Sequence, residues 1–373
     1  AERLRSTTRH TDIVARLGGD EFAILLAEPP VPVTAAQVAE RVIEVIQRTY
    51  LLDGHTVNIG ASVGIALAPE HGDAGGTLLR SADLAMYESK GQGRGRFHLF
   101  EPAMLDRAIR RRANELDLRR ALPLRQFELH YQPQVSIGGD LVGFEALVRW
   151  RHPQRGLIAP NEFLPIADEI GMMNAIGEWV LQAACCEAVK WPADLVVAVN
   201  ASPSQIESGD FTGTVCRALA ATGLPGSRLE IEITEGALLG NNAVVMKTLK
   251  QLRAVGVRIA MDDFGTGYAS LSQLASFPFD KIKIDRSLSG GDGGDDIKKR
   301  AIVRAITALG YSLGVRTLAE GVEDSAQLSR LQTDGCVEVQ GYLFSRPVPV
   351  QELPAIIAKL RRASDDAAVT GVD

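Results

Sequence analysis

Two adjacent aspartates, Asp262 and Asp263, are the feature of this sequence that most directly suggests chemistry. They follow the apolar-leaning segment 257–261 and precede Gly265 and Gly267, an order that indicates a strand running out into a flexible loop. Because side chains alternate along a strand, adjacent acids reach one site only where the strand gives way to a loop. Two neighbouring carboxylates repel and raise each other's pKa unless a cation lies between them. A hard divalent metal ion is the cation that such a pair favours, and a solvated turn is the alternative.

Further polar residues stand in segments that read as strands, most of them near the carboxyl ends, with Glu145 early in its strand. Besides the two aspartates, they are Glu145, Asn200, Glu232, Lys283, Glu320 and Gln340. In the segment 281–285, alternation places both lysines and Asp285 on one face and both isoleucines on the other. Charges that point the same way into an interior must neutralise one another or hold a metal ion. An acid-rich set with one asparagine, one lysine and no converging histidine or cysteine favours Mg²⁺ or Mn²⁺ over Zn²⁺. Such ions commonly work in pairs on phosphate esters.

The elements that must position these residues alternate between strand-like and helix-like patterns from Phe127 onward. The candidate strands are 129–135, 143–150, 196–201, 229–234, 258–262, 281–285, 316–320 and 337–343. Helical patterns such as 241–255 and 297–313 separate most of them. This alternation over about 240 residues predicts an α/β fold, a (β/α)8 TIM-like barrel, with its active site at the carboxyl ends of the strands. A doubly wound sheet is the alternative.

Length and composition set broad limits. A chain of 373 residues predicts two domains, and 46% hydrophobic and 23% charged residues are ordinary for a soluble globular protein. A formal charge of −6 offers no broad basic surface for a nucleic-acid polymer. No apolar run of membrane-spanning length occurs, so no membrane contact is expected from this segment. The four cysteines lack metal-binding spacing, which predicts that they are reduced thiols in a cytoplasmic protein. A full-length parent protein could still be tethered to a membrane.

The first part of the chain contains a second acidic turn. Two β-rich apolar runs flank Gly18 and Gly19, which predicts a hairpin because glycine accepts the positive φ of tight turns. Asp20 and Glu21 follow at once. The sequence Gly-Gly-Asp-Glu-Phe resembles the signature of the GGDEF family of diguanylate cyclases, and the resemblance extends over about residues 1–100. It implies that Asp20 and Glu21 belong to the remnant of a nucleotide site.

The same resemblance implies two further sites in this part of the chain. Lys90 and Arg94 would contact the phosphates of GTP, and Arg9 with Asp12 would form an inhibitory site for the cyclic dinucleotide product. The chain begins seventeen residues before the Gly-Gly turn, so the N-terminal half of an α+β GGDEF domain is missing from this sequence. We therefore expect a truncated GGDEF domain that is inactive as a cyclase, with GTP at the remnant as a further expected partner.

The ends of the second domain are set by helix-rich segments. Residues 101–121 consist mostly of strong helix formers and predict a helical linker, whose arginine stripe reads as a solvated face. Residues 359–373 are expected to form a flexible tail. The second domain then spans 122–358.

Seven short motifs occur in order along the second domain. They are Glu145–Arg149, Asn200, Glu232, Asp262–Gly267, Lys283–Asp285, Ala319–Glu323 and Gln340–Tyr342. Together they resemble the signatures of the EAL family of cyclic di-GMP phosphodiesterases. The resemblance implies a two-metal site for Mg²⁺ or Mn²⁺. Its expected ligands are Glu145, Asn200, Glu232, Asp262 and Asp263.

The EAL resemblance also implies catalytic, substrate-binding and loop residues. Lys283, Glu320 and Gln340 would be catalytic, and which residue is the general base stays open. Gln132, Arg149 and Asp285 would bind the substrate. A regulatory loop that connects the metal site with dimer contacts would involve Glu235, Gly265, Gly267 and Glu323.

The expected function is hydrolysis of cyclic di-GMP to linear pGpG by the barrel, in bacterial second-messenger signalling. A homodimer through the EAL barrel is the expected assembly. One alternative is a receptor that binds cyclic di-GMP without cutting it, and another is a bifunctional cyclase and phosphodiesterase in the full-length parent. The complete set of expected acids favours hydrolysis over binding alone.

Overall fold

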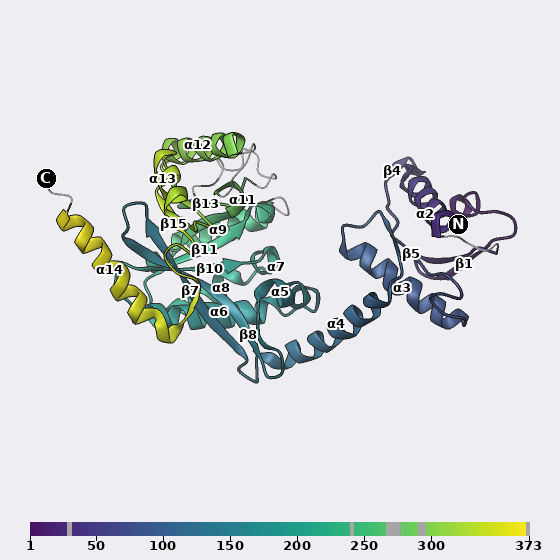
Figure 1. The fold of residues 1–373 in the computed structure, drawn as a ribbon, viewed down its shortest axis with the longest axis horizontal. Helices are drawn as coiled ribbons and strands as arrows, with labels where there is room; N and C mark the ends of the chain where they lie inside the picture. The colour runs from purple at the N-terminus through teal and green to yellow at the C-terminus, as the bar shows by residue number, and fades with distance from the viewer. Residues whose placement is uncertain (28–31, 239–241, 266–276, 278, 290–295, 371–373) are drawn as a thin grey trace. The chain divides into compact units, whose positions relative to one another are not determined.

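The structure is a computed structural model that describes residues 1–27, 32–238, 242–265, 277, 279–289 and 296–370 (Figure 1). The chain divides into two compact units, residues 1–114 and 115–373. The second unit contains the predicted metal site.

A closed ring of strands forms the centre of the second unit. Its members in ring order are β7 (Phe127–Ser136), β8 (Leu141–His152), β10 (Val196–Ala201), β11 (Leu229–Thr234), β12 (Arg258–Phe264), β13 (Lys281–Ile284), β14 (Arg316–Ala319) and β15 (Glu338–Gln340). Strand β15 pairs with β7, which closes the ring. Two short strands, β9 (Gly156–Ile158) and β16 (Val348–Pro349), extend the sheet from β8 and β7. The predicted barrel is therefore confirmed, and each candidate strand overlaps a strand of the ring.

One strand runs against the regular barrel pattern. Strand β7 is antiparallel to both β8 and β15, whereas the other neighbours in the ring are parallel. The reason is the short connection 137–140, because parallel neighbours need a crossover of a dozen or more residues. The reversal matters for the site, since along β7 the residue order from one end of the barrel to the other is inverted.

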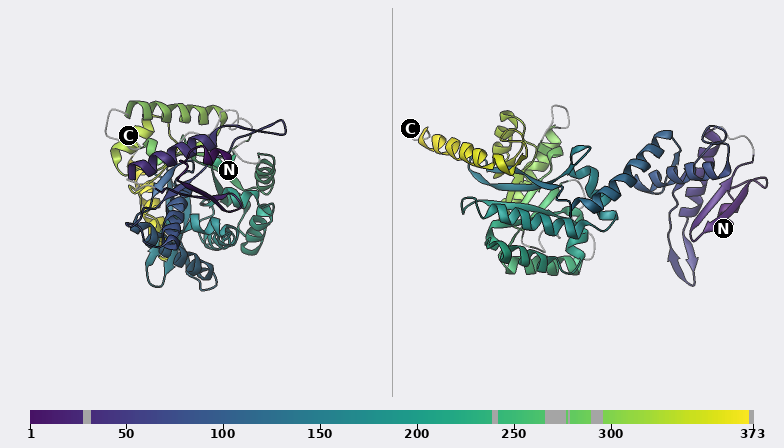
Figure 2. Two further views of the ribbon diagram at one scale, coloured as in Figure 1. Left: turned by 90° about the vertical axis from the view of Figure 1, so that its right-hand side faces the viewer. Right: turned by 90° about the horizontal axis from the view of Figure 1, so that it is seen from below.

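Helices pack around the ring, and the C-terminal helix, yellow in Figure 2, projects from it. They are α5 (Pro160–Glu169), α6 (Met173–Ala188), α7 (Pro203–Glu207), α8 (Phe211–Thr222), α9 (Asn242–Ala254), α11 (Arg286–Ser289), α12 (Asp296–Leu313), α13 (Ser325–Thr333) and α14 (Leu353–Thr370). Within the described ranges, the 3₁₀ helices η1 (Gly226–Arg228), η2 (Glu235–Leu238) and η3 (Val350–Glu352) occupy connections. Helix α14 covers most of the segment predicted as a flexible tail.

The alternation predicted for the strands explains the core. Ile231, Ile259 and Ile282 are fully buried and belong to the same apolar cluster as Leu249 of α9 and Val303 of α12. Burial of such a side chain contributes roughly 1.5–3 kcal/mol. The intervening charged residues of these strands consequently point into the ring.

The first unit consists of small sheets and helices. Strands β1 (Ile13–Gly18) and β2 (Glu21–Leu25) form the predicted hairpin, β3 (Tyr50–Leu52) pairs with β4 (His55–Val57), and β5 (Val63–Ile65) is parallel to β6 (Phe97–Leu99). The helices are α1 (Glu2–Arg5), α2 (Pro32–Gln47), α3 (Gly75–Gly91) and α4 (Pro102–Ala121). The last of these is the helix expected for the linker, and the boundary between the two compact units falls within it.

Candidate metal and substrate site

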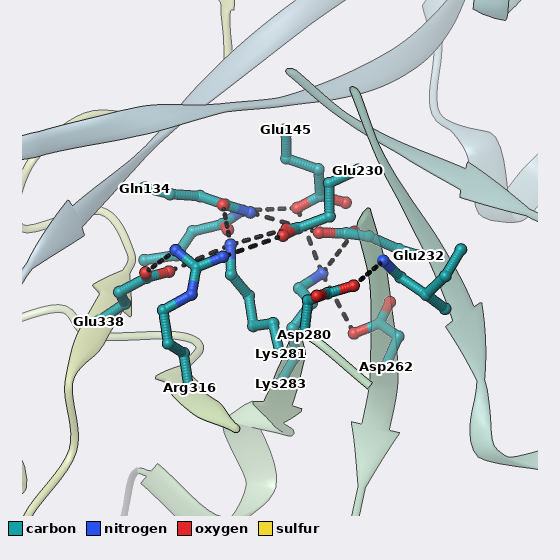
Figure 3. A network of polar contacts seen from close by, with 12 residues as sticks. Gln134, Glu145, Glu230, Glu232, Asp262, Asp280, Lys281, Lys283, Arg316 and Glu338 are labelled. Atoms are coloured by element: carbon teal, nitrogen blue, oxygen red, sulfur yellow. Dashed lines mark hydrogen bonds and ion pairs between the residues drawn. The ribbon is translucent and has the colours of Figure 1, made fainter. Parts of the chain in front are cut away.

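Polar side chains inside the ring come from positions two residues apart on the same strands. Strand β11 contributes Glu230 and Glu232, and β13 contributes Lys281 and Lys283. Because side chains alternate in direction, residues at positions i and i+2 share a face about 6.6 Å apart along the strand. The interior therefore carries two successive layers of charge, both visible in Figure 3.

The first layer surrounds Lys283, whose side chain is 1% exposed. Its Nζ lies 2.7 Å from Glu232 Oε2, 2.8 Å from Glu320 Oε1, 3.1 Å from Asp262 Oδ1 and 3.6 Å from Glu145 Oε2. We call these five residues the Lys283 layer. One ammonium group thus faces four carboxylates, which leaves a large excess of negative charge.

This imbalance shifts the protonation of the layer. Burial alone would lower the pKa of Lys283, but the four carboxylates raise it well above its ordinary value. Burial raises the pKa of Glu232 well above its ordinary value despite the opposing effect of Lys283. Burial alone would raise the pKa of Glu145. The charge of Lys283 and the hydrogen bonds from Gln340 and Asn200 outweigh burial, so the pKa of Glu145 lies below its ordinary value. The layer consequently holds more acid than its lysine can neutralise.

Asp262 and Asp263 do reach one place, as the sequence predicts. The pairing of β12 with β13 shifts register between Met261 and Phe264. Within that irregularity Asp263 has φ +57°, a left-handed conformation that few residues other than glycine adopt. The two aspartates and Glu320 each offer an oxygen within 4.8 Å of the others, the one such group of three among the described residues. The local backbone therefore converts adjacent acids into converging ligands.

The donor set fits a hard divalent cation. All the converging ligand atoms are oxygens, which Mg²⁺, Mn²⁺ and Ca²⁺ prefer. In addition, Oε1 of Gln340 is buried and has no hydrogen-bond partner within the described ranges. Burial, followed by the charges of Asp262 and Asp285, raises the pKa of Asp263. A bound cation would offset both the excess negative charge and the repulsion between these acids.

Residues predicted to bind substrate or to act in catalysis surround this cluster. Gln340 Nε2 donates to Glu145 Oε2 at 2.6 Å and to Gln132 Oε1 at 3.1 Å. Asn200 Nδ2 donates to the other oxygen of Glu145 at 2.6 Å. Arg149 is half-buried, and burial lowers its pKa against the opposing charges of Glu145 and Tyr342. The structure therefore brings the predicted glutamines, Asn200 and Arg149 to the Glu145 side of the Lys283 layer.

The predicted loop residues show one direct connection. Oε2 of the buried Glu235 accepts a hydrogen bond from the backbone N–H of Gly265 at 3.4 Å. Gly265 has φ +100°, a conformation that residues with a Cβ rarely adopt, so the backbone favours glycine here. Gly267 lies outside the described residues. Glu323 is exposed, and its backbone N–H donates to Gln327.

The candidate residues of the first unit lie mostly at the surface. Asp20, Glu21, Lys90, Arg94 and Arg9 are exposed. The carboxylate of Asp12 accepts hydrogen bonds from the N–H of Arg9 at 2.8 Å and of Ala27 at 3.3 Å. Asp12 therefore holds the start of the hairpin through backbone contacts.

The second interior layer was missed by the sequence reasoning as a functional feature. Lys281 Nζ lies 2.7 Å from Glu230 Oε1 and 3.1 Å from Glu338 Oε2, and Arg316 Nη1 lies 2.7 Å from Glu338 Oε1. We call these four residues the Lys281 layer. The signal was present in the alternation, because Glu230 and Lys281 precede Glu232 and Lys283 by two residues.

The protonation of Glu320 predicts a pH dependence of stability. Burial raises its pKa from 4.5 to about 7, against the opposing charge of Lys283. The folded metal-free protein therefore holds a proton that the unfolded chain releases, and the unfolding free energy should fall by up to about 3 kcal/mol as pH rises from about 4.5 to about 7. Denaturant unfolding in EDTA at several pH values measures this slope, which Glu320→Gln should reduce. An unchanged slope in that variant would contradict the assignment.

Comparisons with known proteins agree with the two-unit structure. The model of the EAL domain matches residues 115–347, and that of the diguanylate cyclase GGDEF domain matches residues 1–96. In Pseudomonas aeruginosa, the bifunctional diguanylate cyclase/cyclic di-GMP phosphodiesterase MucR is 43% identical over 96% of this chain and 53% of its own length. The cyclic di-GMP phosphodiesterase NbdA of the same organism is 39% identical over 97% of this chain and 46% of its own. The chain thus spans about half the length of these curated relatives.

A solved structure of a phosphodiesterase also matches this chain. The structure titled PaMucR phosphodiesterase, c-di-GMP complex, is 42% identical, with a TM-score of 0.62 over 65% of this chain and 99% of its own. Helices of the described residues are all too short or too polar to cross a membrane. The barrel, its ordered motifs and these matches lead to one conclusion: the chain belongs to the EAL domain family and carries a GGDEF segment ahead of its barrel.

Proposed function

We propose that the barrel hydrolyses one phosphodiester bond of cyclic di-GMP and releases linear pGpG, with Mg²⁺ or Mn²⁺ as its metal. The observation that carries the proposal is the Lys283 layer. Its four carboxylates and one ammonium group leave an excess of negative charge that divalent cations can offset. Further support comes from the relatives named as cyclic di-GMP phosphodiesterases and from the matched complex with that dinucleotide.

The proposed ligands divide between two metal positions. Glu145, Asn200, Glu232 and Asp262 would hold one metal, and Asp262 with Asp263 would hold the second. When bound, such a pair supplies Lewis-acid polarisation of the phosphoryl group. Support for these ligands is the hydrogen bond that joins Asn200 to Glu145 and the convergence of oxygens of Asp262, Asp263 and Glu320 to within 4.8 Å of one another.

The chain's other residues bind and orient the substrate. Arg149 holds a phosphate, Gln132 and Asp285 contact the dinucleotide, and Gln340 with Lys283 orients the attacking water. Glu320 is the favoured proton acceptor, because its carboxylate lies 2.8 Å from Lys283 Nζ and converges with Asp262 and Asp263. Lys283 is the alternative proton-transfer group.

Metal removal gives the direct test of this function. Dialysis against EDTA should lower the rate of cyclic di-GMP hydrolysis by at least about a hundredfold, since the metals supply most of the charge stabilisation. Readdition of Mn²⁺ should restore it. Hydrolysis that persists after complete metal removal, verified by elemental analysis, would contradict the proposal.

Two further proposals concern partners and setting. GTP binds at the hairpin turn through Asp20, Glu21, Lys90 and Arg94 and modulates the barrel, and two barrels associate as a homodimer. The exposure of these four side chains supports the first of these. The four free cysteines support a cytoplasmic location. Hydrolysis rates with and without GTP, and sedimentation of the purified chain, test the two partner proposals.

A further inference from the structure

Gln134 joins the two charged layers inside the barrel. Its side chain is 2% exposed and lies on β7. Nε2 of Gln134 donates to Glu232 Oε1 at 3.3 Å, and its Oε1 accepts a hydrogen bond from Lys281 Nζ at 2.8 Å. Figure 3 shows this amide between the lysine of one layer and the glutamate of the other. No motif considered above includes Gln134.

The Lys281 layer differs from the Lys283 layer in its charge balance. Lys281 and Arg316 face Glu230 and Glu338, so two positive groups match two negative ones. Lys281, Glu230 and Glu338 are nearly fully buried. Oε2 of Glu230 and Oε2 of Glu338 have ion-pair partners but no hydrogen-bond partner within the described ranges. The matched charges of this layer nevertheless leave no net negative charge for a cation to offset, unlike those of the Lys283 layer.

The residue type at position 134 is the one that can connect these layers. An ammonium group only donates hydrogen bonds and a carboxylate only accepts them, so a link between them must offer both functions. Lys281 fixes the amide orientation, since its Nζ can bond only to Oε1 of Gln134. Nε2 must then face Glu232.

The consequence is a Glu232 carboxylate that is held at both oxygens. Oε1 accepts from Gln134 and Oε2 accepts from Lys283. Each carboxylate oxygen retains a second lone pair for a further ligand. A carboxylate whose side-chain rotation is already fixed by hydrogen bonds loses less conformational entropy when it binds a metal ion.

We propose that Gln134, oriented by Lys281, is a positioning residue that sets the metal affinity of the site by fixing the Glu232 carboxylate. This inference rests on the proposed metal-dependent function and deepens it. Because β7 is antiparallel to its neighbours, the earlier residue Gln132 lies near Gln340 and the later residue Gln134 lies near Lys281.

The test is a direct titration of the metal-free chain with Mn²⁺ by calorimetry. Gln134→Met keeps the approximate volume and removes both hydrogen bonds. It should raise the Kd for Mn²⁺ by about tenfold to a hundredfold, as loss of an outer hydrogen-bond partner of a ligand does. At saturating Mn²⁺ the KM for cyclic di-GMP should stay unchanged, because Gln134 does not contact the predicted substrate residues in the described structure. If the Met variant does not fold, Gln134→Ala leaves room for water to solvate both partners and allows the same titration.

A matched control separates positioning from general destabilisation. Asp334→Asn weakens another ion pair of the barrel unit, between the buried Asp334 and the half-exposed Arg300 at 3.0 and 3.1 Å, and neither residue belongs to the Lys283 layer. It should lower the thermal stability without changing the Kd for Mn²⁺. A Gln134→Met variant whose Kd stays within twofold of the parent, or whose effect adds independently to that of Glu232→Gln, would overturn the proposal.

The titration also distinguishes the two levels of inference. A raised Kd without hydrolysis in any variant would support the role of Gln134 and contradict the proposed function. Unchanged metal binding with full hydrolysis would do the reverse.

Discussion

Glu145→Ala is expected to lower cyclic di-GMP hydrolysis by at least about a thousandfold, more than the roughly tenfold to hundredfold cost of losing an outer partner of a metal ligand. Glu145 accepts 2.6 Å hydrogen bonds from Asn200 and Gln340 on its two oxygens, and it lies 3.6 Å from Lys283. Alanine removes a proposed ligand, the acceptor of the Asn200 amide and the nearer of the two acceptors of Gln340 Nε2. The rate at saturating Mn²⁺ measures the effect.

A second glutamate to alanine change provides the control for this prediction. Glu162 on α5 is exposed and pairs with Arg155 at 2.8 Å, a surface contact worth about 0–1 kcal/mol. Glu162→Ala should retain full activity. If Glu145→Ala kept more than a tenth of the parent rate, Glu145 would not be a ligand of the reacting metal.

Lys283→Met is expected to abolish hydrolysis and also to destabilise the metal-free protein at neutral pH. It leaves four carboxylates without their shared counter-ion, and breaking a buried ion pair costs about 3–5 kcal/mol. Saturating Mn²⁺ should recover much of the stability, because the metal replaces the lost positive charge, but it should not recover the activity. Denaturant unfolding with and without Mn²⁺ provides the measurement.

The neighbouring Lys281 makes the comparison specific, since both lysines lie on β13 and each is 1% exposed. Lys281→Met should also be destabilising, but its carboxylate partners are Glu230 and Glu338, which lie outside the proposed metal site. The stability gained from Mn²⁺ should therefore be larger in Lys283→Met. Equal gains in both variants would contradict the separation of the interior into two layers.

The strands of the barrel could be predicted from sequence because their alternation is strong. The segment 281–285 has charged residues on one face and isoleucines on the other, and the structure buries Ile282 and Ile284 in the apolar core while both lysines point into the ring. The antiparallel direction of β7 was not predicted. The four residues 137–140 between β7 and β8 contained that information, because they are too few for a parallel crossover.

The converging acids were predicted more completely than their supports. Most proposed ligands are acids near the carboxyl end of a strand, and the resemblance of the ordered motifs to the EAL family added Glu145, which lies early in β8. Gln134 has no such signal, because an uncharged amide in a strand is ordinary until its two partners are known. Those partners, Glu232 and Lys281, are 98 and 147 residues away, and only the closed ring brings them together.

The backbone at Asp263 is a further feature that sequence order could only suggest. The expectation that the strand gives way to a loop at the paired aspartates is matched by the irregular register of β12 and the φ of +57°. Asp263 also approaches Glu320, which lies 57 residues later in the chain and directly follows β14. Local patterns do not encode such a contact.

The central claim is that this barrel cuts cyclic di-GMP. The most direct test incubates the purified chain with Mn²⁺ and cyclic di-GMP and separates the products by chromatography. We predict conversion to linear pGpG, with none in a parallel incubation of Glu145→Ala. Recovery of intact cyclic di-GMP from a chain that binds both Mn²⁺ and the dinucleotide would contradict the account and identify the barrel as a receptor.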